Sequence, residues 1–218
     1  SSPGARGDVR IGMKPIDGAF GVLAYNGYPS AGDMVLDSAE NWASPGNSYR
    51  YLRNTVAHEH GHGIGLAHVC PRNSTKLMEP FLATTFDGPQ QDEIRAAQRS
   101  YGDPYEPNST TATATAIGTL SPGGTLTPSA LPAPAVNNAA LTSIGIDNDV
   151  DHFRFTVSVP LLMTATVTPV GSLYADYVQD SACDNATPNT DARGQADLAF
   201  DLLNSAGIRA MALHQRSG

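Results

Sequence analysis

The sequence predicts an α+β domain followed by an all-β domain. Two stretches, residues 49–66 and 87–102, carry the periodicity and end signals of helices, and short strand-like runs at 7–13 and 21–26 precede them. After residue 102 the composition shifts to Thr, Ala, Pro, Ser and Gly, and the apolar residues alternate instead. We therefore expect one domain over residues 1–102 and a β-rich domain over residues 103–218.

The two helices are predicted from different signals. In the first, Leu52, Val56 and Ile64 recur at helical spacing. In the second, Asp87 can cap the helix, Pro89 lies in its first turn and Gly102 can end it.

In the second half, alternation predicts strands over residues 151–159, where Phe153 and Phe155 share a face, and over 162–170. Residues 196–203 read as a further strand that ends in an Asn-Ser-Ala-Gly turn. The Thr-rich run that begins at residue 109 fits either a linker or short strands.

Charge and hydropathy exclude some classes of partner. The formal net charge is −8, and a nucleic-acid partner needs a basic face, so we exclude nucleic acid. No apolar run is long enough to span a membrane, and no signal peptide is visible. An acidic chain of this kind fits a secreted protein or one that binds cations through carboxylates, and we expect a monomer.

The chain has two cysteines, Cys70 and Cys183. Two cysteines so far apart do not make a disulfide framework, and we favour two buried, unpaired thiols over a bridge.

The stretch TVAHEHGHGIGLAH, residues 55–68, predicts a metal site. On a helix, His58 and His62 are one turn apart and share a face, whereas His60 is about 200° round from His58 and points away. Glu59 follows the first histidine, as in the H-E-x-x-H arrangement of two zinc ligands and a general base. Gly65 would let the chain leave the helix and return with His68 as a third ligand. Three imidazoles leave a fourth zinc position open, as a catalytic site requires.

The full pattern His58-Glu59-x-x-His62-x-x-Gly65-x-x-His68 resembles that of the metzincin zinc peptidases, and Met78 in STKLMEP matches their Met-turn. Within that clan the surroundings resemble the matrixins, the matrix metalloproteinase family, of bacterial type. The stretches that carry this resemblance are DGAFGVLAYN, GDMVLDSAENW, KLMEP and QQDEIRAAQRSYG, and the resemblance as a whole covers about residues 8–102. The resemblance implies a twisted, mostly parallel sheet with an active-site helix and a C-terminal helix.

The resemblance also implies roles for individual residues. One catalytic Zn²⁺ is expected on His58, His62 and His68, with Glu59 as the base. The remaining implied residues are Asp17, Asp37 and Glu40 as ligands of a structural Ca²⁺, Asp8 and Asp33 at a second calcium, Leu23 and Ala24 on the strand that pairs with substrate, and Pro80 and Leu82 at the wall of the specificity pocket.

Some positions depart from the matrixin pattern. Tyr25 and Val35 stand where the family's structural zinc needs histidines, so we expect no second zinc. Glu79 replaces the usual tyrosine. The family's first strand and first helix should precede Asp8, and we expect this domain to be incomplete there.

The second half resembles bacterial pre-peptidase C-terminal domains, which are β-sandwich modules, through DPYEPNSTTATAT and DNDVDHFRFTV. We expect this domain to lack its last strands. Asp147, Asp149 and Asp151 alternate and could bind calcium, but we favour a solvated turn.

The sequence therefore predicts a secreted bacterial zinc endopeptidase that acts on protein or peptide substrates. The alternative is a catalytically impaired zinc-binding or surface-binding module on a metzincin scaffold. An intact Glu59 argues for the enzyme.

Overall fold

A computed structural model describes residues 9–128, 142–145, 149–171, 173–176, 179, 183, 189–194 and 198–214. The chain divides into two compact units, one of residues 1–97 and 175–188 and one of residues 98–174 and 189–218. None of the helices in the described residues has the length and apolar character needed to cross a membrane.

The first unit contains a three-stranded sheet in the order β1-β3-β2. Strands β1 (Arg10–Lys14) and β3 (Asp33–Asp37) are parallel, whereas β2 (Ala24–Asn26) runs antiparallel to β3. The sheet therefore has one parallel and one antiparallel pair, and β2 is one of its edges.

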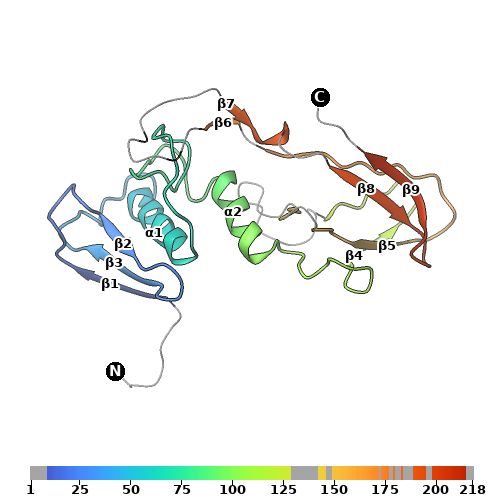
Figure 1. Ribbon diagram of the computed structural model, residues 1–218, viewed down its shortest axis with the longest axis horizontal. Helices are drawn as coiled ribbons and strands as arrows, with labels where there is room; N and C mark the ends of the chain where they lie inside the picture. Colours follow the sequence, from blue (N-terminus) through green and yellow to red (C-terminus); the bar gives the residue numbers. More distant parts are fainter. Residues whose placement is uncertain are drawn as a thin grey trace, which may run out of the picture. The chain divides into compact units, whose positions relative to one another are not determined.

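Helix α1 (Arg50–Gly63) lies beside this sheet and covers its core (Figure 1). Ala24, Met34 and Leu36 are buried at the centre of the packing, and Leu52 and Val56 of the helix lie against them. Burying a side chain of this size stabilises a fold by about 1.5–3 kcal/mol, so the predicted apolar stripe fixes the helix on the sheet.

Helix α2 (Gln91–Tyr101) begins later than the sequence predicts, and its predicted cap is wrong. The carboxylate of Asp87 instead accepts a hydrogen bond from Arg53, at 2.6 Å. The first turn is closed by Glu93, whose carboxylate accepts from the backbone N–H of Gln90 at 2.7 Å. A glutamate in the third helical position that reaches back in this way is half of a capping box.

The second unit holds two described strand pairs. Strand β4 (Thr115–Leu120) is parallel to β5 (Phe153–Val157), and β8 (Ala199–Leu203) forms a hairpin with β9 (Arg209–His214). A third pair joins β6 (Leu173–Ala175) to β7 (Asn189–Asp191), and a 3-10 helix over Ala192–Gly194 follows.

The strand expected within 151–159 is present as β5, and the strand expected within 196–203 is present as β8. The Thr-rich run contains β4, so it is not simply a linker. The strand expected over 162–170 is wrong, because these residues alternate in exposure but join no ladder among the described strands. Alternation sets which side chains face outward, whereas a strand also needs a partner.

The expectation of two unpaired thiols is also wrong. Cys70 and Cys183 form a disulfide that links positions 113 residues apart. The segment around Cys183 is held by hydrogen bonds as well: Arg72 N–H donates to the Cys183 carbonyl at 2.9 Å, and Cys70 N–H donates to the Gln179 side chain at 2.8 Å. Spacing along the chain could not reveal this pair, because only the fold brings the two positions together.

Candidate metal centre

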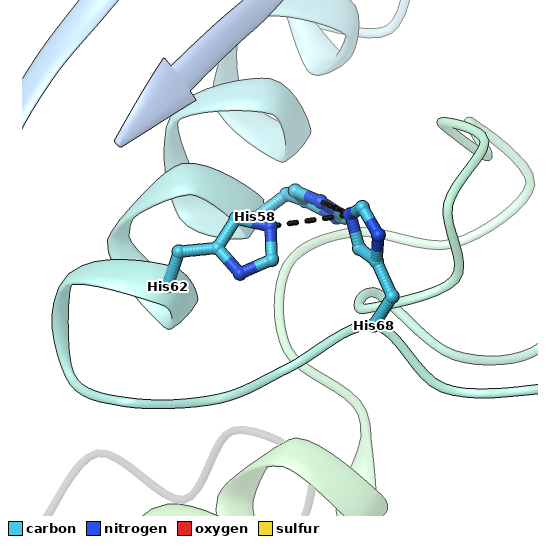
Figure 2. A group of neighbouring side chains, drawn as sticks. All are labelled: His58, His62 and His68. Carbon is cyan, nitrogen blue, oxygen red and sulfur yellow. Dashed lines mark hydrogen bonds between the residues drawn. The ribbon is translucent and has the colours of Figure 1, made fainter. Parts of the chain in front are cut away.

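Three imidazoles converge at the end of α1 (Figure 2). His58 and His62 project from the helix, and His68 comes from the loop that follows it. The Nε2 atom of His68 lies 3.1 Å from Nε2 of His58 and 3.2 Å from Nε2 of His62. Each of the three offers one nitrogen within 4.8 Å of the other two.

The outer nitrogens of the two helical histidines are already occupied. Nδ1 of His58 lies 2.7 Å from the Leu77 carbonyl, and Nδ1 of His62 lies 2.7 Å from the Leu66 carbonyl. A carbonyl can only accept, so each Nδ1 carries the proton and each Nε2 presents a lone pair to the centre. Burial lowers the pKa of His58 to about 4 and lowers the pKa of His68, so these rings are neutral at pH 7.

The loop reaches this position through the helix end that the sequence predicts. Gly65 N–H donates to the His62 carbonyl and Leu66 N–H donates to the Gly61 carbonyl, both at 2.9 Å. This pair of bonds is a Schellman motif, which needs a left-handed residue at its centre. Gly65 supplies it with φ of 99°, and the chain then turns back to place His68 against the helix.

This donor set fits zinc. Zinc bound to imidazole at about 2.0–2.1 Å in a tetrahedron separates its ligand nitrogens by about 3.3 Å, close to the distances between these Nε2 atoms. Nε2 of His68 lies within hydrogen-bond distance of both helical Nε2 atoms, and a cation at this point could bind all three nitrogens at once. A fourth tetrahedral position would stay free, because among the described residues only these three histidines converge at this point as ligand-type side chains.

Glu59 follows His58 on α1 and has an unused oxygen. Its side chain is buried, and its Oε2 atom has no hydrogen-bond partner among the described residues. Burial raises the pKa of this carboxyl to about 7. A buried carboxylate without a partner is costly, and such cost is common where a group must act on a substrate. His60, in contrast, is exposed, as its position on the helix predicts.

Met78 lies directly against α1, where the Met-turn is expected. It is 1% exposed, and a Cβ on Gly61 would come within 2.4 Å of its sulfur atom. Only glycine permits this close approach. The residue before it supplies the carbonyl that holds His58, so the turn and the ligand are positioned together.

Glu79 is a supporting residue that the sequence analysis noted only as a departure. Its buried carboxylate accepts four backbone N–H groups at 2.7–3.0 Å, those of Asn73, Ser74, Thr75 and Lys76. The Lys76 ammonium lies 3.7 Å away, and this ion pair is also buried. Glu79 therefore organises the loop that leads into the Met-turn, a role that needs the acceptor oxygens of a carboxylate.

Two further side chains tie the surroundings of the centre together. Glu93 accepts a hydrogen bond from Met78 N–H at 3.0 Å, which connects α2 to the Met-turn. Asn26 donates to the Glu59 carbonyl at 2.7 Å, which connects β2 to α1. No local sequence signal identifies these contacts, because each joins elements distant in the chain.

The residues predicted to bind structural calcium are engaged in other contacts. Asp37 accepts hydrogen bonds from the N–H groups of Ala39, Asp17 and Gly18, and these bonds lower its pKa. Glu40 accepts from Phe20 N–H and from the Tyr51 hydroxyl. Asp17, Asp37 and Glu40 are not one of the carboxylate groups whose oxygens converge within 4.8 Å in the described residues. Calcium binding there stays a prediction.

The other predicted residues are placed as follows. Asp33 forms an ion pair with Arg10, and Asp8 lies outside the described residues, as does Asp147. The Leu23 carbonyl accepts from Asp37 N–H, and Ala24 pairs with Leu36. Pro80 and Leu82 are half-buried, while a nearby surface hollow is lined by Arg72, Ser74, Glu79 and Phe81.

Residues 6–102 match the family described as Matrixin. Among curated relatives, the chain is 33% identical to matrix metalloproteinase-18 of Xenopus laevis over 138 residues, which are 60% of this chain and 26% of that protein. It is 36% identical to stromelysin-3 of Mus musculus over 96 residues, 41% of this chain and 19% of the relative. It is 39% identical to interstitial collagenase of Bos taurus over 108 residues, 47% of this chain and 22% of the relative.

These matches support a matrixin domain in residues 6–102, and with it an α+β fold of the metzincin type. The chain spans between 19% and 26% of the length of these three relatives.

Proposed function

We propose that this chain is a zinc-dependent endopeptidase with its active centre at the end of α1. The observation that carries the proposal is an open three-imidazole centre at a helix that also bears Glu59, whose buried Oε2 atom has no partner among the described residues. The matrixin match over residues 6–102 supports the same activity.

In this proposal His58, His62 and His68 would hold the metal. Bound zinc would polarise the scissile carbonyl and lower the pKa of its water toward about 7. Glu59 accepts the proton of that water and passes it to the leaving amine. The raised pKa of Glu59, about 7, suits a group that must both take and release a proton near neutral pH.

The substrate would bind along β2. This strand is an edge of the sheet, so its outer backbone groups can pair with an extended peptide in the manner of β-augmentation. Leu23 and Ala24 would contribute that pairing, and Pro80 and Leu82 would border the pocket for the side chain after the cleaved bond. Asn26 fixes the distance between this strand and the helix that bears Glu59.

Several finer features belong to the same proposal. A disulfide is typical of oxidising compartments, which supports secretion. We further propose a bacterial extracellular enzyme that acts as a monomer, has structural calcium at Asp17, Asp37 and Glu40, and carries a pre-peptidase C-terminal-like β-sandwich in residues 103–218. The β4–β5 and β8–β9 pairs support the β-rich part of that proposal.

The test is Glu59→Gln, assayed for cleavage of casein or gelatin with zinc content measured in parallel. The amide keeps the shape of the side chain but cannot take the proton. We expect one zinc per chain in both proteins and a loss of rate of about 10²–10⁴ in the variant. His60→Gln is the matched control, since His60 is exposed on the same helix, and it should cleave like the wild type.

A wild-type rate in Glu59→Gln would show that another group is the base. Bound zinc with no chelator-sensitive cleavage by the wild-type chain would favour the alternative, a zinc-binding module without peptidase activity.

A further inference from the structure

A second cluster of ligand-type side chains lies in the other unit and shares no residue with the zinc centre. Glu106, Asp149 and Asp151 each offer one carboxylate oxygen within 4.8 Å of the other two. Glu106 follows the end of α2 in the chain, and the two aspartates precede β5. A cluster of acids alone is common on protein surfaces, so the state of each oxygen decides what the cluster can do.

Asp151 is the least satisfied of the three. Both of its oxygens are inaccessible to solvent, and neither has a hydrogen-bond partner among the described residues. Burial raises the pKa of this carboxyl to about 7, and the charged groups that raise it further are the carboxylates of Asp103, Asp149 and Glu106. Neither water nor a described donor with the geometry of a hydrogen bond therefore compensates its charge.

Asn108 adds an independent observation. It is 0% exposed, and both its amide nitrogen and its amide oxygen lack partners among the described residues. Its side chain lies close enough to Asp151 to lower the pKa of that carboxyl, although no pair of their atoms has the geometry of a hydrogen bond. A fully buried amide with both polar atoms unused is rare in native proteins unless a ligand completes it.

The neighbouring backbone contacts leave oxygens free. Glu106 uses Oε2 to accept from Asn108 N–H at 2.9 Å, and Asp149 uses Oδ2 to accept from Gly145 N–H at 2.7 Å. Each then has a second oxygen for a ligand. Asp103 differs, because its Oδ1 accepts from Tyr105 N–H and its Oδ2 from Ser143 N–H.

We propose that Glu106, Asn108, Asp149 and Asp151 form a calcium site. A proton shared among the carboxyl groups would still leave the Asn108 amide without a partner, whereas a cation satisfies the carboxylates and the amide oxygen at once. The donors are all oxygens, with no imidazole or thiolate, which excludes a preference for zinc. Ca²⁺ accepts six to eight oxygens in irregular geometry at about 2.3–2.6 Å, so oxygens up to about 5 Å apart can share one ion.

The site would join the segment after α2 to the residues that precede β5, which already contact one another. His152 N–H donates to the Asn108 carbonyl at 2.9 Å, and Thr115 N–H donates to the His152 carbonyl at 2.9 Å. A bound ion would fasten the segment after α2 to the start of β5. Calcium should therefore stabilise the second unit specifically.

The test is equilibrium dialysis of the zinc-loaded full chain against Ca²⁺. The proteins are the wild type, Asp151→Asn, Asp149→Asn and a control, Asp201→Asn, in which the changed acid lies on β8 and pairs with Arg209. We expect each cluster variant to bind one Ca²⁺ fewer than the wild type, or to bind that ion at least about tenfold more weakly. The control should match the wild type.

The comparison isolates this cluster, because any calcium at Asp17, Asp37 and Glu40 is the same in all four proteins. Folding is checked by the thermal midpoint in chelator, where Asp151→Asn should be at least as stable as the wild type since it removes an unpaired charge. Calcium should raise the midpoint of the wild type and the control more than that of the cluster variants. Equal calcium binding by all four proteins, or none by the wild type at millimolar Ca²⁺, would overturn the proposal.

Discussion

The two halves of the candidate zinc centre are built in different ways. His58, Glu59 and His62 lie on one helix, so their relative positions follow from regular α-helix geometry. His68 and Met78 lie on loops, and their positions depend on contacts with parts of the chain far away. The helical half is therefore set by local spacing, and the loop half by tertiary structure.

The contacts that hold the loop half are numerous and mostly buried. Glu79 gathers four backbone N–H groups, Glu93 holds the Met78 N–H, and the Cys70–Cys183 disulfide secures the chain just after His68. In this centre, two ligands depend on the regular geometry of the helix, and the third depends on a separately supported loop.

Removal of a single histidine ligand should have the largest effect on zinc binding and cleavage. It should also distinguish the helical half of the centre from the loop half. His58→Ala and His68→Ala should each weaken zinc binding by more than about a hundredfold and abolish cleavage, since outer-shell partners alone are worth about 10–100-fold. Only His58→Ala should also lower the stability of the metal-free chain, by about 1 kcal/mol, because only His58 bonds to the Leu77 carbonyl. Zinc titration and unfolding in chelator measure the two effects, and equal metal-free stabilities would contradict the distinction.

The next effect concerns the buried carboxylate of the loop half. Glu79→Gln presents an amide N–H₂ to backbone donors and leaves Lys76 without its buried carboxylate, so we expect a loss of about 3–5 kcal/mol. Asp87→Asn is the matched control, because its ion pair with Arg53 is exposed and should be worth less than about 1 kcal/mol. Denaturant unfolding compares the two, and similar losses would show that Glu79 does not organise the loop.

The disulfide should give the smallest of the three effects. Cys70→Ser/Cys183→Ser should cost about 2–4 kcal/mol of unfolding free energy, because a long loop in the unfolded chain is no longer closed. Zinc affinity should fall while the helix signal in circular dichroism stays, since the bridge supports the loop half only. Unchanged stability in non-reducing denaturant titrations would contradict this role.

The same division explains how much of the structure could be predicted. The α1 helix, the outward position of His60 and the turn at Gly65 all follow from residues within one or two helical turns, and the structure shows each of them. Strand β5 also follows from local alternation.

The wrong predictions concern residues whose structure depends on a partner that is distant in the sequence. Asp87 pairs with Arg53 rather than capping α2, residues 162–170 alternate without a partner strand among the described residues, and Cys70 meets Cys183.

Two carboxylate sites, at Glu79 and at the acidic cluster of the second unit, also lack a local signal. The role of Glu79 is hidden in the sequence, because its four donors are brought together only by the folded loop. The sequence around Asp149 and Asp151 favours a solvated turn. Glu106 and the buried Asn108 are more than 40 residues away in the chain, so the nearby sequence gives no sign of them.

The bridge between Cys70 and Cys183 also determines what a cut in the chain would produce. Any single break between these two positions, including one anywhere in β4 or β5, leaves two polypeptides that are still covalently joined. Such a molecule would keep its mass on a non-reducing gel and separate into two bands only after reduction. The cross-link would therefore keep both fragments in one molecule after such a cut.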